Sequence, residues 1–378
     1  MHRLRYLRNY MSRCLHGDLQ VTAEVERELF CGNDAMSEAA IQAGCRCYFG
    51  YPITPQNEVT AYMAKRMPEV GGVFLQAESE VAAINMVFGA SAVGVRAMTS
   101  SSSPGISLKQ EGISYLAGCE LPAVIVNVQR GGPGLGSIGP SQSDYYQATR
   151  GGGHGDYRTL TLAPSTVQEL VDHTMLAFDI ADEYRNPTLV LSDGILGQMM
   201  EPVSIPGNKK QHSFDKSSWT LTGAKGRKPN VIRSLFLDNV TLERLNDKIA
   251  KKLERMEKNE IRFESYRLND AELVLTAYGS VARICKSAVN RMRKEGIKAG
   301  LFRPITLWPF PYDEISKTLK TAKAYLDVEM NMGQMIDDVK LGIKCALPVH
   351  FYGRCGGVVM TVDEVVEKAH QVIKESFK

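Results

Sequence analysis

The chain has 378 residues, which is long enough for two domains that each bury a hydrophobic core. Hydrophobic residues make up 44% and charged residues 23% of it, a composition that excludes a collagen-like, disordered or disulfide-rich secreted protein. The 45 basic and 42 acidic residues leave a net charge of only +3, so no nucleic acid is expected as a partner.

No apolar stretch reaches the ~18 residues needed to cross a bilayer, so no membrane partner is expected either. The eight cysteines show no C-x-x-C spacing of the kind that binds zinc or iron–sulfur clusters. We therefore predict free thiols and no metal site on this chain. The composition as a whole predicts a cytoplasmic location.

The first segment, residues 1–21, has four arginines and no acidic residue before Asp18. Such a segment resembles a transit peptide, but it is poor in serine, and Met11 offers a second possible start. We expect a disordered or mis-assigned leader here.

Residues 22–200 alternate between short apolar stretches and amphipathic ones. The apolar stretches include "CRCYFGYP", "GGVFLQAE", "VRAMTSS", "LPAVIVNVQR" and "NPTLVLSDG". Strands of almost continuous Val, Ile and Leu that alternate with helices indicate a parallel sheet covered on both faces. This region is predicted to be an α/β domain.

Residues 201–265 begin with a polar stretch rich in glycine and proline and continue into a charged helical pattern, which indicates a linker or insert. A second α/β domain is predicted over 266–378, from the strand "AELVLTAYGS" onward. Its last helix begins with "TVDE", in which Thr361 and Glu364 form a predicted capping box.

The stretch "YFGYPITPQNEV" passes from a strand into a helix. Thr54 is suited to be the N-cap of that helix and Pro55 its first residue. A helix start at the carboxyl end of a parallel strand is also where α/β proteins bind anions. Thr54 is therefore either only a cap or also a contact for a small carboxylate.

The segment "QAESEVAAINMVFGASAVG" places Glu78 and Glu80 where a strand gives way to an almost uncharged helix. A carboxylate at a helix start can simply stabilise the helix dipole. An acid held in apolar surroundings is also a typical functional group, because burial perturbs its pKa. The apolar residues that follow favour Glu80 over Glu78 for such a role.

Two further strands end in loops suited to a ligand. "TSSSSPGISLKQEG" offers serine hydroxyls, although such runs are commonly loops without further function. "QRGGPGLGSIGPSQSD" lets the backbone approach a ligand closely, and Arg130 is either a carboxylate-binding residue or a structural one at the strand end. The coincidence of four such strand ends predicts a binding site.

Taken together, the motifs resemble the alpha subunit of the 2-oxoacid:ferredoxin oxidoreductases. The blocks that carry the resemblance are Y-P-I-T-P, "QAESEVAA", "TSSSSPGIS", "RGGPGLGS" and "SQSDY", in this order, over about residues 28–378. The branched-chain members, which act on 3-methyl-2-oxobutanoate, are the most similar. The resemblance implies a thiamine-diphosphate-binding domain of the pyrimidine type, followed by a transketolase C-terminal-like domain.

The resemblance also implies a role for each matching residue. Glu80 is expected to be catalytic, because it occupies the position of the family's glutamate that hydrogen-bonds the coenzyme aminopyrimidine at N1′. Thr54 and Arg130 are expected to bind the 2-oxo acid. Coenzyme contacts are expected from Glu80 and also from Tyr51, Pro52, Ile53, Ser101 and Ser102.

Family members act with companions, which the resemblance implies here as well. A beta subunit is expected to hold Mg²⁺ and the diphosphate of the coenzyme, because "LSDGILGQMM" lacks the G-D-G motif and a matching asparagine. A gamma subunit and a ferredoxin-like subunit with iron–sulfur clusters are also expected. CoA, ferredoxin and a 2-oxo acid are the expected small partners and substrates.

One departure concerns the substrate. Several relatives have a P-T-R-T segment with an arginine near the substrate, whereas this chain has the shorter, uncharged "SIGPSQSD". That favours an aliphatic 2-oxo acid over 2-oxoglutarate. A 2-oxoglutarate or broad-specificity enzyme remains the first alternative, and a non-catalytic scaffold or regulatory subunit the second.

Overall fold

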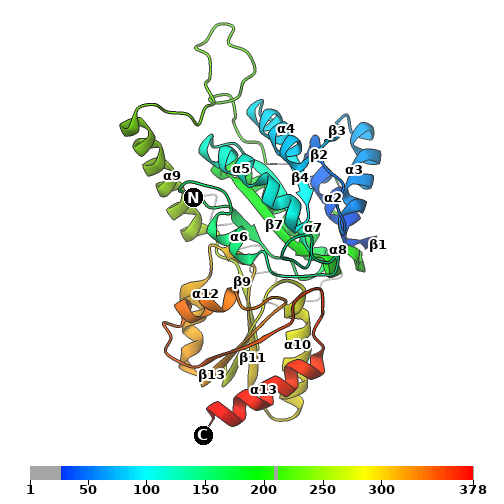
Figure 1. Cartoon of the computed structure of the whole chain (residues 1–378), viewed down its shortest axis with the longest axis vertical. Coiled ribbons are helices and arrows are strands. Elements are labelled where there is room, and N and C mark those ends of the chain that lie inside the picture. The colour runs from blue at the N-terminus through cyan, green and yellow to red at the C-terminus, as the bar shows by residue number, and fades with distance from the viewer. Residues whose placement is uncertain (1–26, 208–211, 378) are drawn as a thin grey trace, which may run out of the picture.

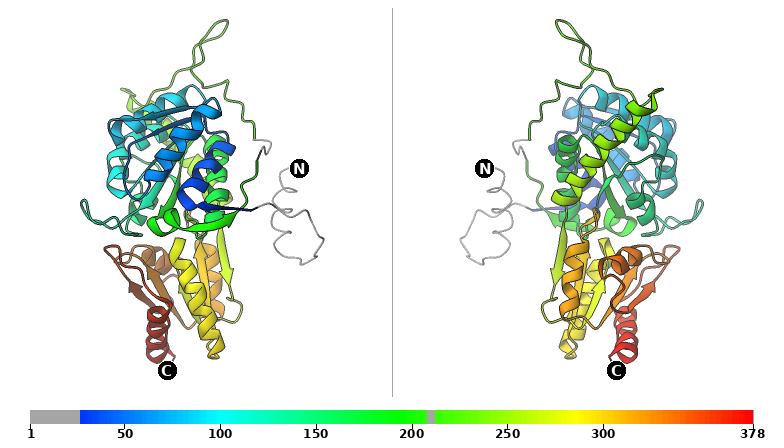
Figure 2. Two further views of the ribbon diagram at one scale, coloured as in Figure 1. Left: turned by 90° about the vertical axis from the view of Figure 1, so that its right-hand side faces the viewer. Right: turned by 90° about the vertical axis from the view of Figure 1, so that its left-hand side faces the viewer.

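The computed structural model describes residues 27–207 and 212–377. The leader expected at residues 1–21 lies outside this part of the chain. Figures 1 and 2 show two α/β domains joined end to end along the long axis. The N-terminal domain lies above and the C-terminal domain below. The α/β fold expected from the sequence is confirmed.

The upper sheet has seven strands in the order β12-β6-β7-β5-β4-β2-β3. All neighbours run parallel except β12 and β6, which are antiparallel. The strands are β2 (Cys47–Gly50), β3 (Val73–Gln76), β4 (Ala97–Ser101), β5 (Ala123–Gln129), β6 (Leu160–Leu162), β7 (Pro187–Asp193) and β12 (Thr306–Trp308). Strand β12 thus belongs to the upper sheet, although in the chain it comes after the first three strands of the lower domain.

Helices cover both faces of this sheet. One face packs against α2 (Gly32–Gln42), α3 (Asn57–Glu69) and α7 (Val167–Tyr184), and the other against α4 (Glu80–Ala92) and α5 (Ser103–Gly118). A right-handed crossover places its helix on a face that depends on the direction in which the chain moves along the sheet. The chain moves from β2 to β3 through α3 and then back past β2 to β4 through α4, so α3 and α4 lie on opposite faces.

Smaller elements complete the upper domain. The short helices are α6 (Tyr145–Arg150) and α8 (Gly194–Gln198), and β1 (Glu28–Cys31) pairs antiparallel with β8 (Met200–Val203). After β8 the described chain has no helix or strand until residue 239. A loop of this segment stands away from the domain at the top of Figure 1, whereas Trp219 is buried against the domain. The charged pattern of the expected insert forms α9 (Asn239–Asn259).

The lower domain has five strands in the order β14-β13-β10-β11-β9. Helices α10 and α13 cover one face, while α11 and α12 lie on the other. These elements are β9 (Phe263–Tyr266), β10 (Leu273–Thr276), α10 (Gly279–Lys294), β11 (Ala299–Pro304), α11 (Tyr312–Ser316), a 3₁₀ turn (Lys317–Lys320), β13 (Ala324–Glu329), α12 (Met335–Gly342), β14 (Val349–Gly353) and α13 (Val362–Ser376). The capping box predicted from Thr361 and Glu364 is confirmed at the start of α13.

The two domains meet through buried polar contacts below the carboxyl ends of the upper strands. The Gln142 side chain donates to the carbonyl of Tyr278 at 2.9 Å and accepts from the amide of Met330 at 3.1 Å. The buried Arg303 guanidinium donates two hydrogen bonds to the Glu169 carboxylate, at 2.8 and 3.0 Å. Such charge-assisted, two-pronged bonds fix the relative orientation of the groups they join.

Candidate active site

The reversal of strand order lies between β2 and β4. In doubly wound α/β sheets, ligands bind outside the carboxyl ends of the strands at this point, because the loops diverge there and leave a crevice. The loop after β2 contains Tyr51 to Pro55, and the chain after β4 contains Ser101 and Ser102. The loop after the neighbouring β3 leads into Glu80. The predicted site residues are therefore brought to one edge of one sheet.

Glu80 is the first residue of α4 and is only 6% exposed, whereas Glu78 is exposed. The hydroxyl of Ser79 caps the helix by accepting from the amide of Ala82 at 3.2 Å. Since the cap is supplied by Ser79, the Glu80 carboxylate is not used for it. No group in the described part of the chain donates a hydrogen bond to this carboxylate.

The Glu80 carboxylate lies over Gly105, in the first turn of α5. A β-carbon on Gly105 would come within 2.6 Å of Glu80 Oε1 and would also overlap the hydroxyl of Ser101. Glycine is thus required here because the carboxylate and the hydroxyl occupy the space of a side chain. Gly105 was not among the predicted site residues, although a glycine directly after the serine-proline pair was the available signal.

The four serines do not form a loop, contrary to the common behaviour of such runs. Ser100 and Ser101 end strand β4, Ser102 is the N-cap of α5, and Ser103 is the first residue of that helix. The hydroxyls of Ser101 and Ser102 are completely buried and have no hydrogen-bond partner within the described residues. Buried hydroxyls without a partner are costly, so these two are suited to bind a polar ligand.

The loop with Tyr51, Pro52 and Ile53 is open to solvent, with Tyr51 38% exposed. It is tied to the sheet by the buried Gln56, whose amide nitrogen donates to the Tyr51 carbonyl at 3.4 Å. The carbonyl oxygen of the same side chain accepts from the hydroxyl of Ser100. The loop is therefore held in a fixed place beside strand β4.

Thr54 is not the N-cap that the sequence predicted. Helix α3 begins at Asn57, with Gln56 at the N-cap position. The reason is that the carbonyl of Pro55 accepts from the side chains of Asn33, at 2.9 Å, and Gln198, at 3.0 Å, so residues 54 and 55 form a turn outside the helix. The Thr54 hydroxyl accepts from the Asn57 side chain at 3.2 Å.

Arg130 joins two of the loops at the strand ends. Its guanidinium donates to the backbone carbonyl of Thr54 at 2.9 Å and to that of Leu135 at 3.1 Å. Its Nε is buried and has no partner in the described part of the chain. Arg130 therefore has a structural role in placing Thr54 and still keeps one unused donor.

Lys109, in α5, was missed by sequence reasoning. It is completely buried, and its ammonium donates to the Thr99 hydroxyl at 2.7 Å and to the Ser100 carbonyl at 3.1 Å. Burial lowers the pKa of Lys109 to about 7, while the negative charge of Glu80 counteracts this lowering. The only available signal was its spacing of four residues, about one helical turn, from Gly105.

A cleft of about 340 Å³ opens beside Thr54. It lies between the start of α3, helix α8 and the glycine-rich segment after β5. Its lining contains one carboxylate, that of Glu58, and no cationic side chain. The lining residues are Thr54, Pro55, Asn57, Glu58, Ile138, Pro140, Gly194, Ile195 and Gln198.

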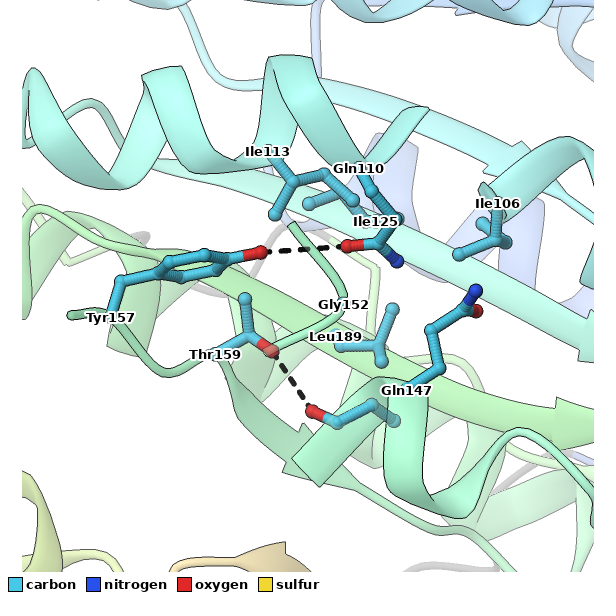
Figure 3. Close-up of a pocket in the computed structure, with 10 residues that line it drawn as sticks. Ile106, Gln110, Ile113, Ile125, Gln147, Gly152, Tyr157, Thr159 and Leu189 are labelled. Carbon is cyan, nitrogen blue, oxygen red and sulfur yellow. Dashed lines mark hydrogen bonds between the residues drawn. The ribbon is translucent and has the colours of Figure 1, made fainter. Parts of the chain in front are cut away.

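A second cavity, behind α5, is too small to hold a ligand, with a volume of about 10 Å³. Figure 3 shows the Tyr157 hydroxyl pointing across it toward Gln110, which accepts its hydrogen bond at 3.5 Å. Ile106, Ile125 and Leu189 supply an apolar wall. We interpret this space as a packing gap between α5 and the loop that precedes β6.

Asp193, from the segment "LSDGILGQMM", uses both of its carboxylate oxygens in hydrogen bonds within the protein. Its carboxylate accepts from the amides of Ile195 and Leu196 and from the hydroxyl of Ser280. The sequence predicted a turn at this strand end, but the chain passes directly from β7 into the short helix α8, because the Asp193 carboxylate caps that helix. Within residues 27–207 and 212–377, no three His, Cys, Asp or Glu side chains lie close enough together to hold a metal ion.

The fold and this edge of the sheet define a class of protein: a doubly wound α/β chain with a buried carboxylate and two unpaired hydroxyls at the carboxyl ends of its strands. Residues 38–267 match the family described as pyruvate flavodoxin/ferredoxin oxidoreductase, thiamine diphosphate-binding. Residues 271–365 match pyruvate:ferredoxin oxidoreductase core domain II. The chain belongs to the pyruvate flavodoxin/ferredoxin oxidoreductase family.

Individual relatives narrow the comparison. The ketoisovalerate oxidoreductase subunit VorB of Methanothermobacter thermautotrophicus is 51% identical, over 91% of this chain and 97% of its own length. The 2-oxoglutarate synthase subunit KorA of Methanocaldococcus jannaschii is 39% identical, over 89% of this chain and 98% of its own. The resemblance inferred from the sequence is thereby confirmed.

Among solved structures, a 2-oxoglutarate:ferredoxin oxidoreductase from Magnetococcus marinus, with 2-oxoglutarate, coenzyme A and succinyl-CoA bound, superposes with a TM-score of 0.83. It is 26% identical, and the match covers 97% of this chain and 69% of that one. The described part of the present chain has no helix that is both long and apolar enough to cross a bilayer.

Proposed function

We propose that this chain is the alpha subunit of a thiamine-diphosphate-dependent oxidoreductase that converts branched-chain 2-oxo acids, chiefly 3-methyl-2-oxobutanoate, to acyl-CoA, carbon dioxide and reduced ferredoxin. The observation that carries the proposal is the Glu80 carboxylate, buried over Gly105 without a hydrogen-bond donor and next to the unpaired hydroxyl of Ser101. The identity with VorB favours this substrate class over the others in the family.

The buried Glu80 carboxylate and the unpaired hydroxyls of Ser101 and Ser102 are proposed to hold the aminopyrimidine ring of thiamine diphosphate. When bound, this coenzyme supplies a carbon nucleophile that attacks the keto carbon of a 2-oxo acid and permits loss of carbon dioxide. Glu80 would accept a hydrogen bond from protonated N1′ of the ring and would thereby influence the proton affinity of the ring. The hydroxyls of Ser101 and Ser102 supply further partners, while Tyr51, Pro52 and Ile53 form the wall of the site toward solvent.

The 2-oxo acid is proposed to bind between the loops that follow β2 and β5. The Thr54 hydroxyl and the unused Nε–H of Arg130 are donors suited to its carboxylate. Because Arg130 also holds the Thr54 carbonyl, the two donors stay in a fixed relation to one another. A bound carboxylate is therefore oriented with little further ordering of the protein.

The side chain of the 2-oxo acid is proposed to lie in the cleft beside Thr54. Ile138, Pro140 and Ile195 give this cleft apolar walls, and its single charged group is the carboxylate of Glu58. Glu58 is already bonded to the side-chain amides of Asn33 at 2.9 Å and Gln198 at 3.0 Å. A second carboxylate on the substrate would meet this negative charge, so an isopropyl group fits the cleft better than the side chain of 2-oxoglutarate.

The identity with KorA keeps 2-oxoglutarate as the second candidate substrate. Turnover of the assembled complex with 3-methyl-2-oxobutanoate and with 2-oxoglutarate, as the ratio of kcat/KM, separates the two. We expect a clear preference for the branched-chain acid. A preference for 2-oxoglutarate would show that the cleft beside Thr54 does not accommodate the side chain.

Other subunits are proposed to complete the enzyme. Mg²⁺ and the coenzyme diphosphate would be held by a beta subunit, since Asp193 is used as a helix cap and bonds Ser280. Iron–sulfur clusters would lie on a ferredoxin-like subunit, with a gamma subunit as the fourth component. We also propose a cytoplasmic location, where the seven described cysteines, all unpaired, stay reduced.

Replacement of Glu80 by Gln tests the proposal. We expect turnover and hydrogen–deuterium exchange at C2 of the bound coenzyme to fall by about two orders of magnitude or more, because an amide cannot take up the proton. Glu78→Gln is the matched control, since Glu78 is exposed two residues earlier and should behave like the wild type. Normal activity of the Glu80 variant would instead support a non-catalytic scaffold.

A further inference from the structure

Lys109 is a fully buried lysine with no carboxylate bonded to it. Lysine is rarely buried unless a negative charge compensates it. Its ammonium bonds the Thr99 hydroxyl and the Ser100 carbonyl, both in strand β4 directly before Ser101 and Ser102. Two of its three N–H donors are thus used to hold the strand end that contributes to the proposed coenzyme site.

The compensating charge is that of Glu80. Lys109 follows Gly105 by four residues on α5, so the two lie on the same face of the helix, and the Glu80 carboxylate rests over Gly105. The field of Glu80 opposes the loss of charge that burial imposes on the Lys109 ammonium. The two side chains form no direct ion pair in the described part of the chain, so their charges act on one another through space.

Apart from Glu80, helix α4 and the strands beneath α4 and α5 contribute no charged side chain to this layer. Glu80 is the only titratable residue of α4, and strands β4 and β5 have none. Strand β2 contributes Cys47 and Tyr48, and burial raises the pKa of both, so both are neutral near pH 7.

The remaining titratable groups near α5 have partners of their own. Glu111 is exposed and accepts from the Tyr115 hydroxyl at 2.6 Å. Asp144, whose pKa is raised by burial, accepts from Ser103 and Asn127. Asp193, at the end of β7, is bonded to α8 and Ser280. His154 contacts Ser114 at 3.3 Å. Among the described residues of this layer, Glu80 and Lys109 are therefore the two buried charged side chains that are not bonded to a counter-charge.

We propose that Lys109 is a positioning residue for Glu80: its ammonium offsets the buried negative charge and fixes the end of β4, so that Glu80 stays an ionised hydrogen-bond acceptor under the coenzyme ring. The inference rests on the coenzyme role proposed above for Glu80. Without a nearby positive charge, covering the carboxylate with a ring and a partner subunit would favour its protonation.

The first test is the pH profile of the assembled complex. Lys109→Met keeps the length and apolar stem of the side chain but removes the charge. The acidic limb of kcat/KM should move to higher pH, because losing a nearby positive charge makes the ionised form of a buried carboxylate less favourable. Lys252→Met is the matched control: Lys252 is also buried, but its partner is Glu120, at 3.7 Å, and the profile should not change.

The second test needs no turnover. The complex is assembled without coenzyme from this chain labelled with ¹³C at the ε-carbon of lysine, and the lysine resonances are titrated by NMR. One resonance should titrate near pH 7 and be absent from the Lys109→Met protein. In Glu80→Gln the same resonance should titrate at lower pH, because the stabilising negative charge is gone.

The outcomes separate this proposal from the function on which it rests. An unchanged acidic limb in Lys109→Met, or a lysine titration unaffected by Glu80→Gln, would overturn the positioning role of Lys109 while leaving the function intact. Normal turnover of Glu80→Gln would overturn the proposed function itself. Since Glu80→Gln keeps Lys109 in place, the NMR comparison decides the matter even for a Lys109→Met chain that does not assemble.

Discussion

The carboxylate of Glu80 lies over the α-carbon of Gly105, where helix α4 and helix α5 begin side by side. The missing side chain of Gly105 is what leaves room for the carboxylate and for the Ser101 hydroxyl. A buried acid at this point can face a ligand instead of the protein interior, because the hydroxyl of Ser79 already caps α4.

Gly105→Ala should therefore damage the site more than the fold. The new methyl group would displace the Glu80 carboxylate, and a misplacement of about 1 Å is expected to lower turnover roughly a hundredfold. Gly89→Ala is the control, since Gly89 lies within α4 and a β-carbon there meets nothing within 4 Å. That variant should keep its activity and gain up to about 1 kcal/mol of stability. Equal activity of the two variants would contradict the packing described here.

The cleft beside Thr54 should determine substrate preference. Ile138→Arg places a cation among the lining residues, and the ratio of kcat/KM for 2-oxoglutarate over 3-methyl-2-oxobutanoate should rise about tenfold or more. Leu135→Arg adds the same charge on a side chain that is 83% exposed and does not line the cleft. If both variants change the ratio equally, the effect is general electrostatics and the assignment of the cleft is wrong.

Stability should fall in acid because of a buried histidine in α7. Burial lowers the pKa of His173 to about 4, with Glu169 counteracting the shift. An unfolded chain takes up this proton near pH 6.5, so stability is lost as the pH falls from 6.5 to 4, by about 3 kcal/mol. His173→Gln should flatten this part of a plot of unfolding free energy against pH, measured by chemical denaturation.

At lower pH, protonation of Glu169 should reduce stability further. Burial alone would raise the pKa of Glu169, but the hydrogen bonds and charge of Arg303 outweigh it and lower the pKa to about 2. Protonation of Glu169 between pH 4.5 and 2 therefore removes a further 2 to 3 kcal/mol, approximately, of stability. The same denaturation series, continued to pH 3 on Glu169→Gln, should show a smaller loss than the wild type.

The contact between the domains depends on a buried acid in α12. The Tyr145 hydroxyl donates to Asp338 at 2.6 Å, and Arg150 donates to the same carboxylate at 2.9 Å. Tyr145→Phe removes one of three side-chain hydrogen bonds to the completely buried Asp338 carboxylate, which keeps those from Arg150 and Tyr312, so unfolding free energy should fall by about 1 to 3 kcal/mol. Tyr146→Phe removes only a surface bond to Asp337 and should change it by less than about 0.5 kcal/mol.

Much of this arrangement could be predicted from the sequence, because it depends on short-range patterns. The alternation of apolar strands and amphipathic helices predicted a parallel α/β domain, and the capping box at Thr361 was placed correctly. Glu80 was preferred to Glu78 because apolar residues follow it, and it is the buried one of the pair. Each of these inferences uses only neighbours within one strand or one or two helical turns.

Other features were decided by contacts between segments far apart in the chain. Thr54 was expected to cap a helix, but Asn33 and Gln198 hold the Pro55 carbonyl outside it. Strand β12 completes a sheet formed otherwise by residues 47–193. Lys109 has the appearance of a solvent-facing residue in the sequence, and only the packing of α5 against β4 buries it.

The physical reason for the difference is range. Hydrophobic periodicity and capping depend on interactions between residues that are close in sequence, and these interactions are set by the local backbone conformation. Which helix start faces which loop depends on how a twisted sheet brings its strand ends together. The sequence by itself therefore determined the elements and the identity of the buried acid, while the tertiary structure decided that Gly105 and Lys109 would lie beside it.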